Sequence, residues 1–90
     1  MMETYIISYD LNSDKSSDYT KLIDFIKSFG TWAHITESTW AIKTNKTAKE
    51  IRDEIADIMP EGSRLFVVKS GLSSAWRNVI CSNDWLKKYL

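Results

Sequence analysis

The chain has very little cysteine and no repeated or low-complexity segment. Its 90 residues include one cysteine, Cys81, three glycines and one proline. A single cysteine cannot form a disulfide within the chain, and it has no neighbours at metal-ligand spacing. The sequence therefore excludes both a disulfide-stabilised scaffold and a cysteine-based metal site.

The sequence also lacks long apolar runs and any excess of charge. No run is long enough to cross a bilayer and no signal-peptide pattern is present at the N-terminus, so we expect no membrane partner and a cytoplasmic location. Lysine plus arginine and aspartate plus glutamate each total 12, which gives a net charge of zero. Any site for a polyanion must therefore be a local patch.

Aromatic residues are abundant for a chain of this length. Four tryptophans, four tyrosines and three phenylalanines contribute to a hydrophobic fraction of 43%. This composition predicts one folded domain over residues 1–90. A core this small favours oligomerisation.

The spacing of apolar residues predicts six elements in the order strand, helix, strand, strand, helix, strand. This order is typical of the α+β ferredoxin-like fold, a four-stranded antiparallel sheet with two helices on one face. The core would span about residues 4–70, and residues 71–90 would form a C-terminal extension. The expected elements cover residues 4–10, 19–28, 31–36, 39–44, 47–59 and 64–69.

Two further elements are expected in the C-terminal extension. Residues 76–80 could form a short extra strand, and Ser82 caps a last amphipathic helix.

Both faces of the inner strands are apolar, because Ile6 alternates with Ile7 and Phe66 alternates with Val67. We therefore expect the open face to contact a second copy of the chain or the C-terminal segment.

Asp10 is the acidic residue with the strongest positional argument for function. It ends a buried strand, where a carboxylate is held rigidly and still meets solvent. One interpretation is a ligand for a divalent metal; the alternative is a carboxylate that accepts hydrogen bonds from the amides of Asn12 and Ser13. One carboxylate is a poor site for a hard cation, but a two-fold dimer would bring two copies of Asp10 together. A shared cation could then activate water and neutralise a phosphodiester.

Three other residues are weaker candidates for a site. Asp14 could add a metal ligand, although a solvated loop or a helix cap is the favoured explanation. Ser38 lies between the hairpin strands, but no histidine or lysine motif marks it as a nucleophile. His34 is the only histidine and thus the one candidate for histidine acid-base chemistry, with a structural role as the alternative.

Basic residues on the strands and their flanks could contact phosphates, with Trp40 or Trp76 available for stacking on bases. The alternative is ordinary solvated charge combined with core aromatic residues. The basic residues are Lys43, Lys46, Arg64, Lys69 and Arg77.

Three short motifs and the order of elements resemble a known family. Tyr9-Asp10-Leu11 ends the first strand, Phe29-Gly30 closes the first helix, and Glu37-Ser38-Thr39-Trp40 enters the third strand. In these features the chain resembles the small CRISPR-associated proteins of the second Cas family over about residues 4–70. It differs from many relatives in residues 12–18, where they carry arginines and lysines.

The resemblance implies a ferredoxin-like homodimer in which residues 75–81 form a strand that pairs with the other subunit. The two copies of Asp10 would face each other across the two-fold axis as catalytic metal ligands. The ion would be Mg²⁺, with Mn²⁺ as an alternative. Ser38 would match the family serine and Trp40 its aromatic residue. Members of the family are described as magnesium-dependent nucleases on RNA or DNA.

The function expected from this resemblance is a homodimeric endonuclease that hydrolyses RNA or DNA. Two alternatives stay open. The first is a non-catalytic dimeric module that bridges nucleic acid or protein partners in a larger complex. The second is a related ribonuclease toxin.

Overall fold

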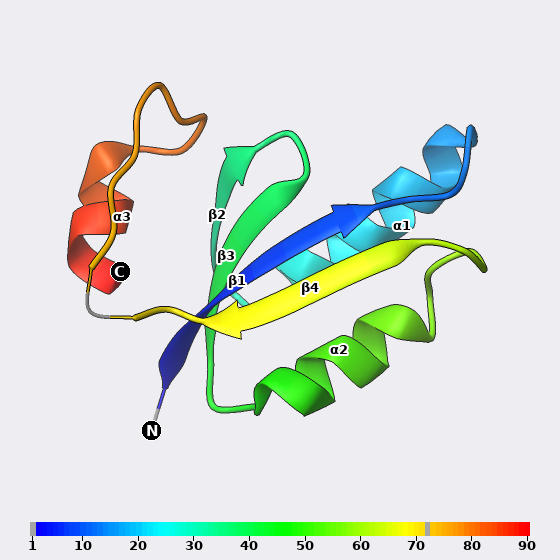
Figure 1. The fold of residues 1–90 in the computed structure, drawn as a ribbon, viewed down its shortest axis with the longest axis horizontal. Helices are drawn as coiled ribbons and strands as arrows, with labels where there is room; N and C mark the ends of the chain where they lie inside the picture. The colour runs from blue at the N-terminus through cyan, green and yellow to red at the C-terminus, as the bar shows by residue number, and fades with distance from the viewer. Residues whose placement is uncertain (1, 72) are drawn as a thin grey trace.

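The computed structural model describes residues 2–71 and 73–90, which form one sheet and three helices. The four strands are antiparallel in the order β2-β3-β1-β4 (Figure 1). This is the strand order of the ferredoxin-like α+β fold, and it confirms the predicted fold class. The elements are β1 (Glu3–Asp10), α1 (Ser16–Lys27), β2 (Thr31–Thr36), β3 (Thr39–Thr44), α2 (Ala48–Ala56), β4 (Arg64–Lys69) and α3 (Asn83–Tyr89).

The hydrophobic core lies between the sheet and the helices α1 and α2. Alternate residues of a strand share one face, and residues three or four apart share one face of a helix. The sheet therefore presents one set of apolar side chains to the two helices, and each helix packs one stripe of apolar side chains against the sheet. The buried members of this core are Tyr5, Ile7, Tyr9, Leu11, Leu22, Ile26, Trp40, Ile42, Ile51 and Ile55.

The helix α2 begins with a complete capping box. The Thr47 hydroxyl accepts a hydrogen bond from the Glu50 amide at 3.1 Å, and the Glu50 carboxylate accepts one from the Thr47 amide at 3.0 Å. These bonds satisfy two amides that have no partner within the helix. The hydrogen bond from the Thr47 amide is the main cause that lowers the pKa of Glu50 below its ordinary value of 4.5.

Replacing Thr47 with alanine should lower the free energy of unfolding by about 1 kcal/mol at neutral pH. Because the pKa of Glu50 is lowered by folding, its carboxylate stabilises the fold above its ordinary pKa of 4.5, and this stabilisation is lost as the pH falls through the folded-state pKa. Alanine keeps the backbone amide that is the main cause of the lowered pKa, so both proteins should lose most of this stabilisation in acid. The difference between them should shrink only by the smaller contribution of the Thr47 side chain. Urea unfolding followed by circular dichroism measures both effects.

Lys49→Ala is the matched control, because Lys49 lies in the same turn of α2 and is exposed. Its side chain takes no part in the capping box. Equal losses of stability for Thr47→Ala and Lys49→Ala would contradict the role of the cap.

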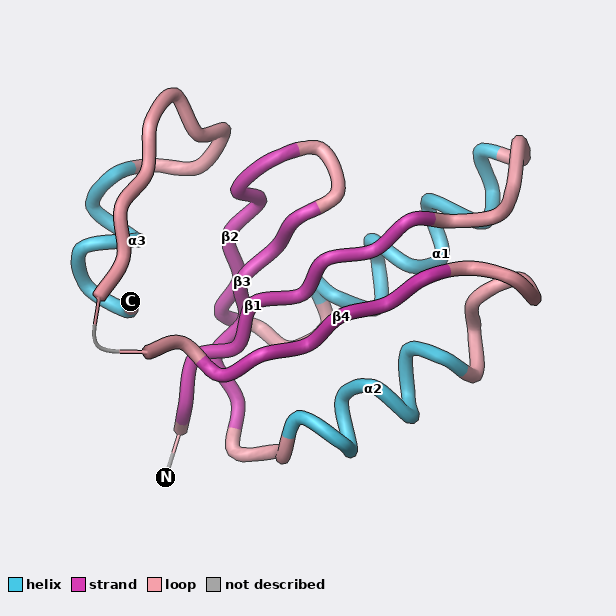
Figure 2. The backbone as a smooth tube through the Cα atoms, in the orientation of Figure 1, coloured by secondary structure: helices cyan, strands magenta, loops and turns pink. Residues whose placement is uncertain are grey.

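The C-terminal helix covers part of the open face of the sheet. Figure 1 and Figure 2 show α3 beside β2, away from α1 and α2. The Thr4 hydroxyl donates to the Tyr89 carbonyl at 2.8 Å, and the Lys43 ammonium lies 4.7 Å from the centroid of the Tyr89 ring. Leu86 is buried. The expected contact between the open face and the C-terminal segment is thus present over β2, β3 and the start of β1.

The extra strand expected at residues 76–80 is not formed, and that prediction is wrong for the single chain. One backbone hydrogen bond, from the Ile80 amide to the Ile35 carbonyl at 2.9 Å, joins this segment to β2. Asn78 has a φ of 56°, which interrupts an extended backbone. The helix capped by Ser82 is confirmed, since the Ser82 hydroxyl accepts from the Trp85 amide at 3.3 Å.

The rest of the open face, over β1 and β4, carries exposed apolar side chains. Phe66 is 62% exposed and Val68 is 41% exposed. Val68 pairs with Ile6 across the two strands, so Ile6, Phe66 and Val68 share this face. We call these three residues the exposed strip. A contiguous apolar surface of this kind is typical of an interaction site.

Within the described ranges, none of the helices combines the length and the apolar character needed to cross a membrane.

Candidate functional site

Asp10 is an exposed carboxylate at the end of a buried strand. It pairs in register with Arg64 on β4, and the Asp10 Oδ2 atom lies 3.8 Å from the Arg64 Nη1 atom. The two side chains are 75% and 85% exposed, respectively. An ion pair this exposed contributes at most about 1 kcal/mol. The carboxylate oxygens are therefore available to another cation.

A cavity of about 560 Å³ lies where the end of β1 meets the turn between β2 and β3. The amide of Tyr9 donates to the carbonyl of Ser38 at 3.1 Å and holds the turn beside the strand end. Asp10 and Ser38 consequently line the same cavity. The lining residues are Tyr9, Asp10, Leu11, Tyr19, Glu37 and Ser38.

A smaller cavity of about 210 Å³ also includes Asp10. It is lined by the loop after β1 and by the start of β4. Asn12 closes it through a hydrogen bond from its amide nitrogen to the Glu61 carbonyl at 3.0 Å. Gly62 has a φ of 86°, and a Cβ there would lie 2.7 Å from the Asn12 amide nitrogen, so a side chain does not fit.

Tyr9 fixes the wall of the larger cavity. Its hydroxyl donates to the Glu37 carbonyl at 3.5 Å and accepts from the Trp40 Nε1 at 3.2 Å. Burial raises the pKa of Tyr9 above 10.0, partly offset by the hydrogen bond from Trp40. The phenol is therefore neutral at physiological pH and acts as a hydrogen-bonding group. Sequence reasoning missed this role of Tyr9, although its alternation with Asp10 already placed it on the helix face.

One chain does not by itself provide a full set of metal ligands. Among residues 2–71 and 73–90, no three histidine, cysteine, aspartate or glutamate side chains are placed to hold a metal ion. Mg²⁺ keeps several of its waters and is often bound by one or two carboxylates. Asp10 is an exposed oxygen donor of the right type, with the Ser38 hydroxyl bordering the same cavity. Glu37 is the other carboxylate that lines this cavity, and the remaining ligands would be waters or oxygen atoms from outside the chain.

Comparison with known proteins supports the fold. No family model matches the chain, and a search of curated proteins finds no match. The structure is similar to the crystal structure of a hypothetical protein, TT1823, from Thermus thermophilus, with a TM-score of 0.67 and 17% sequence identity. The match covers 88% of this chain and 95% of that chain. At this identity the likeness shows the shared architecture alone, and function has to be argued from the site.

Asp14 and His34 lie apart from Asp10. Asp14 is exposed in the loop before α1 and lines neither cavity at Asp10. His34 stacks on Trp40 with ring centroids 4.0 Å apart and an interplanar angle of 12°. Its Nε2 atom lies 3.2 Å from the Glu37 carbonyl. These contacts favour the structural interpretation of the histidine.

The five basic residues do not gather into one patch around Asp10. Arg64 alone lies beside it, while Lys46 forms a salt bridge with Glu54 at 2.6 Å. Lys69 lies 3.5 Å from Glu3, at the opposite end of β4 from Arg64. A strand rises about 3.3 Å per residue, which separates Lys69 from Asp10 by roughly 17 Å. Lys43 contacts Tyr89 of α3, and Arg77 is exposed in the segment after β4.

Proposed function

We propose that the protein is a homodimeric, magnesium-dependent endonuclease that resembles the small CRISPR-associated proteins of the second Cas family. In this proposal the Asp10 carboxylates of two subunits hold the ion, which is Mg²⁺ or Mn²⁺. The observation that carries the proposal is the exposed Asp10 at a rigid strand end, bordering a cavity shared with Ser38. RNA and DNA are both candidate substrates.

Each residue at this cavity has a task that follows from its chemistry. When bound, a divalent ion lowers the pKa of water and neutralises charge on a phosphodiester. Arg64 can contact a phosphate oxygen, because its guanidinium is exposed and lies next to Asp10. The Ser38 hydroxyl can donate a hydrogen bond to a substrate oxygen from the opposite wall. Tyr9 holds that wall in place.

The exposed strip supports a dimer whose interface borders Asp10, and the two copies of Asp10 meet in it if the two-fold axis passes near this strand end. Side chains two residues apart in a strand share one face, so Ile6, Ser8 and Asp10 point to the same side of the sheet. A two-fold contact uses the same patch on both subunits. Contact through the exposed strip therefore places each Asp10 beside the dimer interface.

Removing the metal tests the enzymatic proposal directly. We expect the protein to cleave labelled RNA or DNA in the presence of Mg²⁺ and to stop when EDTA is added at constant ionic strength. Restoring Mg²⁺ or adding Mn²⁺ should restore cleavage. Gel analysis of end-labelled strands measures the rate, with the Asp10→Asn variant as the control for a contaminating nuclease. Cleavage that persists in EDTA would contradict the proposed mechanism.

The second candidate function is a non-catalytic dimeric module that bridges nucleic acid or protein partners. The scattered basic residues and the zero net charge favour it. Calorimetric titration without saturable Mg²⁺ binding, together with retained partner binding by Asp10→Asn, would select this function. A ribonuclease toxin would instead arrest growth on expression, and Asp10→Asn would relieve that arrest.

A further inference from the structure

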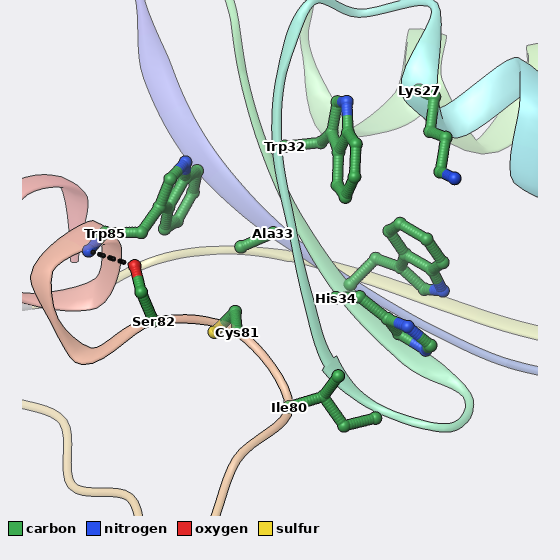
Figure 3. A pocket seen from close by; sticks show the side chains of 9 residues that line it. Lys27, Trp32, Ala33, His34, Ile80, Cys81, Ser82 and Trp85 are labelled. Carbon is green, nitrogen blue, oxygen red and sulfur yellow. Dashed lines mark hydrogen bonds between the residues drawn. The ribbon is translucent and has the colours of Figure 1, made fainter.

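A third cavity lies at the opposite edge of the sheet from β4. Its volume is about 420 Å³, within the range of about 300–1,000 Å³ that is usual for small-molecule sites. Figure 3 shows its side chains arranged around β2, with Trp85, Ser82 and Cys81 on one side and Trp32, Lys27 and His34 on the other. We call it the aromatic pocket. Its lining residues are Lys27, Trp32, Ala33, His34, Trp40, Ile80, Cys81, Ser82 and Trp85.

The aromatic pocket offers flat rings for stacking. It contains three of the four tryptophans of the chain, and Trp32 among them is 36% exposed although its ring centroid lies 5.5 Å from that of the buried Trp40. Trp40 in turn stacks on His34. A structural role in the core accounts for Trp40 but leaves the exposure of Trp32 unexplained. Exposed rings next to a cavity are typical of sites that bind another flat ring.

The charge of the aromatic pocket is positive. The Lys27 Nζ atom lies 4.9 Å from the centroid of the Trp32 ring. No aspartate or glutamate lines the pocket, and Lys27 forms no salt bridge within the described ranges. A ligand that combines a flat ring with a negative group satisfies both features. A nucleotide is such a ligand, since its base stacks and its phosphate pairs with an ammonium.

The aromatic pocket and the Asp10 cavity flank the same turn. The Glu37 carbonyl accepts a hydrogen bond from Tyr9 and lies 3.2 Å from His34 Nε2. Tyr9 and Glu37 line the Asp10 cavity, whereas His34 lines the aromatic pocket. A nucleic-acid strand that crosses the turn between β2 and β3 can therefore reach both sites.

We infer that the aromatic pocket binds one unpaired nucleotide of a nucleic-acid strand, with the base against Trp32 and the phosphate at Lys27. A base within a duplex is stacked on its neighbours, so only an unpaired base can enter. This inference rests on the proposed function and deepens it. The inference predicts that the substrate is single-stranded where it passes β2.

The test measures binding in the absence of Mg²⁺, so that no cleavage occurs. Fluorescence anisotropy of a labelled single-stranded oligonucleotide gives the Kd, and a blunt duplex of the same sequence serves as the comparison. We expect the single strand to bind more tightly than the duplex. Trp32→Leu and Lys27→Gln should each raise the Kd about tenfold, through loss of stacking and of a phosphate contact.

A matched control carries the lysine substitution outside the pocket. Lys21→Gln changes an exposed lysine on α1 that does not line the pocket. It should leave the Kd unchanged. Lys27 is also exposed, so Lys27→Gln tests the pocket even if Trp32→Leu fails to fold.

Equal Kd values for the wild type and the two pocket variants would overturn the inference, and so would equal affinity for single strand and duplex. Quenching of tryptophan fluorescence by adenosine monophosphate gives the Kd of a single nucleotide. A Kd equal to that of the strand would overturn the assignment of the pocket to a nucleic-acid strand. Asp10→Asn should retain binding at the pocket. If the strand binds at the pocket but Mg²⁺ supports no cleavage, the proposed nuclease is wrong and the pocket inference stands. If the protein cleaves but the pocket variants bind like the wild type, the pocket inference is wrong and the proposed nuclease stands.

Discussion

Replacing Asp10 with asparagine should lower the rate of magnesium-dependent cleavage by at least about 100-fold and leave the fold unchanged. Even the groups that support a metal ligand contribute about 10–100-fold to affinity or activity, and a direct ligand contributes more. Asparagine keeps the size of the side chain but removes its charge and one acceptor oxygen. Because Asp10 is 75% exposed and its ion pair with Arg64 is 3.8 Å long, the substitution costs little stability.

The measurement is the initial rate of cleavage of an end-labelled strand at saturating Mg²⁺, together with the midpoint of thermal unfolding. Asp14→Asn is the matched control, since it makes the same chemical change four residues further along in an exposed loop. It should leave both the rate and the midpoint unchanged. If Asp10→Asn cleaves at the wild-type rate, the catalytic role of Asp10 is wrong, and the activity comes from another site of the protein or from a contaminant.

The strands could be predicted closely from the sequence, and the helix ends could not. The observed bounds of β2, β3 and β4 are those expected, because runs of β-branched and aromatic residues coincide with the hydrogen-bonded ladder. The helix α2 ends at Ala56, although the apolar spacing predicted a helix as far as Met59. Ile58 and Met59 still pack on the core. The spacing of apolar residues therefore predicts which side chains are buried. It does not predict where the helix ends, because residues after the last helical hydrogen bond are also buried.

The candidate site was predictable only where local chain geometry determines it. Asp10 and Ser38 meet because a strand end and the adjacent hairpin turn lie at the same edge of the sheet. The aromatic pocket is different, because it joins Lys27 of α1 to Trp32 of β2 and Trp85 of α3. Such a site depends on where α3 packs. No sequence spacing encodes that position.

In the proposed dimer, replacing Phe66 with glutamate should separate the two subunits into monomers. In a two-fold contact through the exposed strip, each new carboxylate would lie near its own symmetry copy in an apolar surface, and like charges so placed cost several kcal/mol. The dimer Kd should rise at least about 100-fold, since about 1.4 kcal/mol corresponds to a factor of ten. Sedimentation velocity over a range of protein concentrations measures the shift. Cleavage should be lost with the dimer, although Asp10 itself is untouched.

Ile80→Glu is the control, because it adds the same charge at a different position. It distinguishes an effect of the position of the charge from an effect of charge alone. Ile80 is 58% exposed, close to the 62% of Phe66, and it lies at the β2 edge of the sheet. This variant should remain dimeric, and the oligomeric state is its readout, because Ile80 lines the aromatic pocket and a negative charge there opposes binding of the substrate. A wild-type protein that is monomeric at micromolar concentration would remove the second Asp10 carboxylate on which the nuclease depends. A Phe66→Glu variant that is monomeric yet fully active would show that one Asp10 is sufficient, because the exposed ion pair with Arg64 leaves its oxygens free to bind a cation.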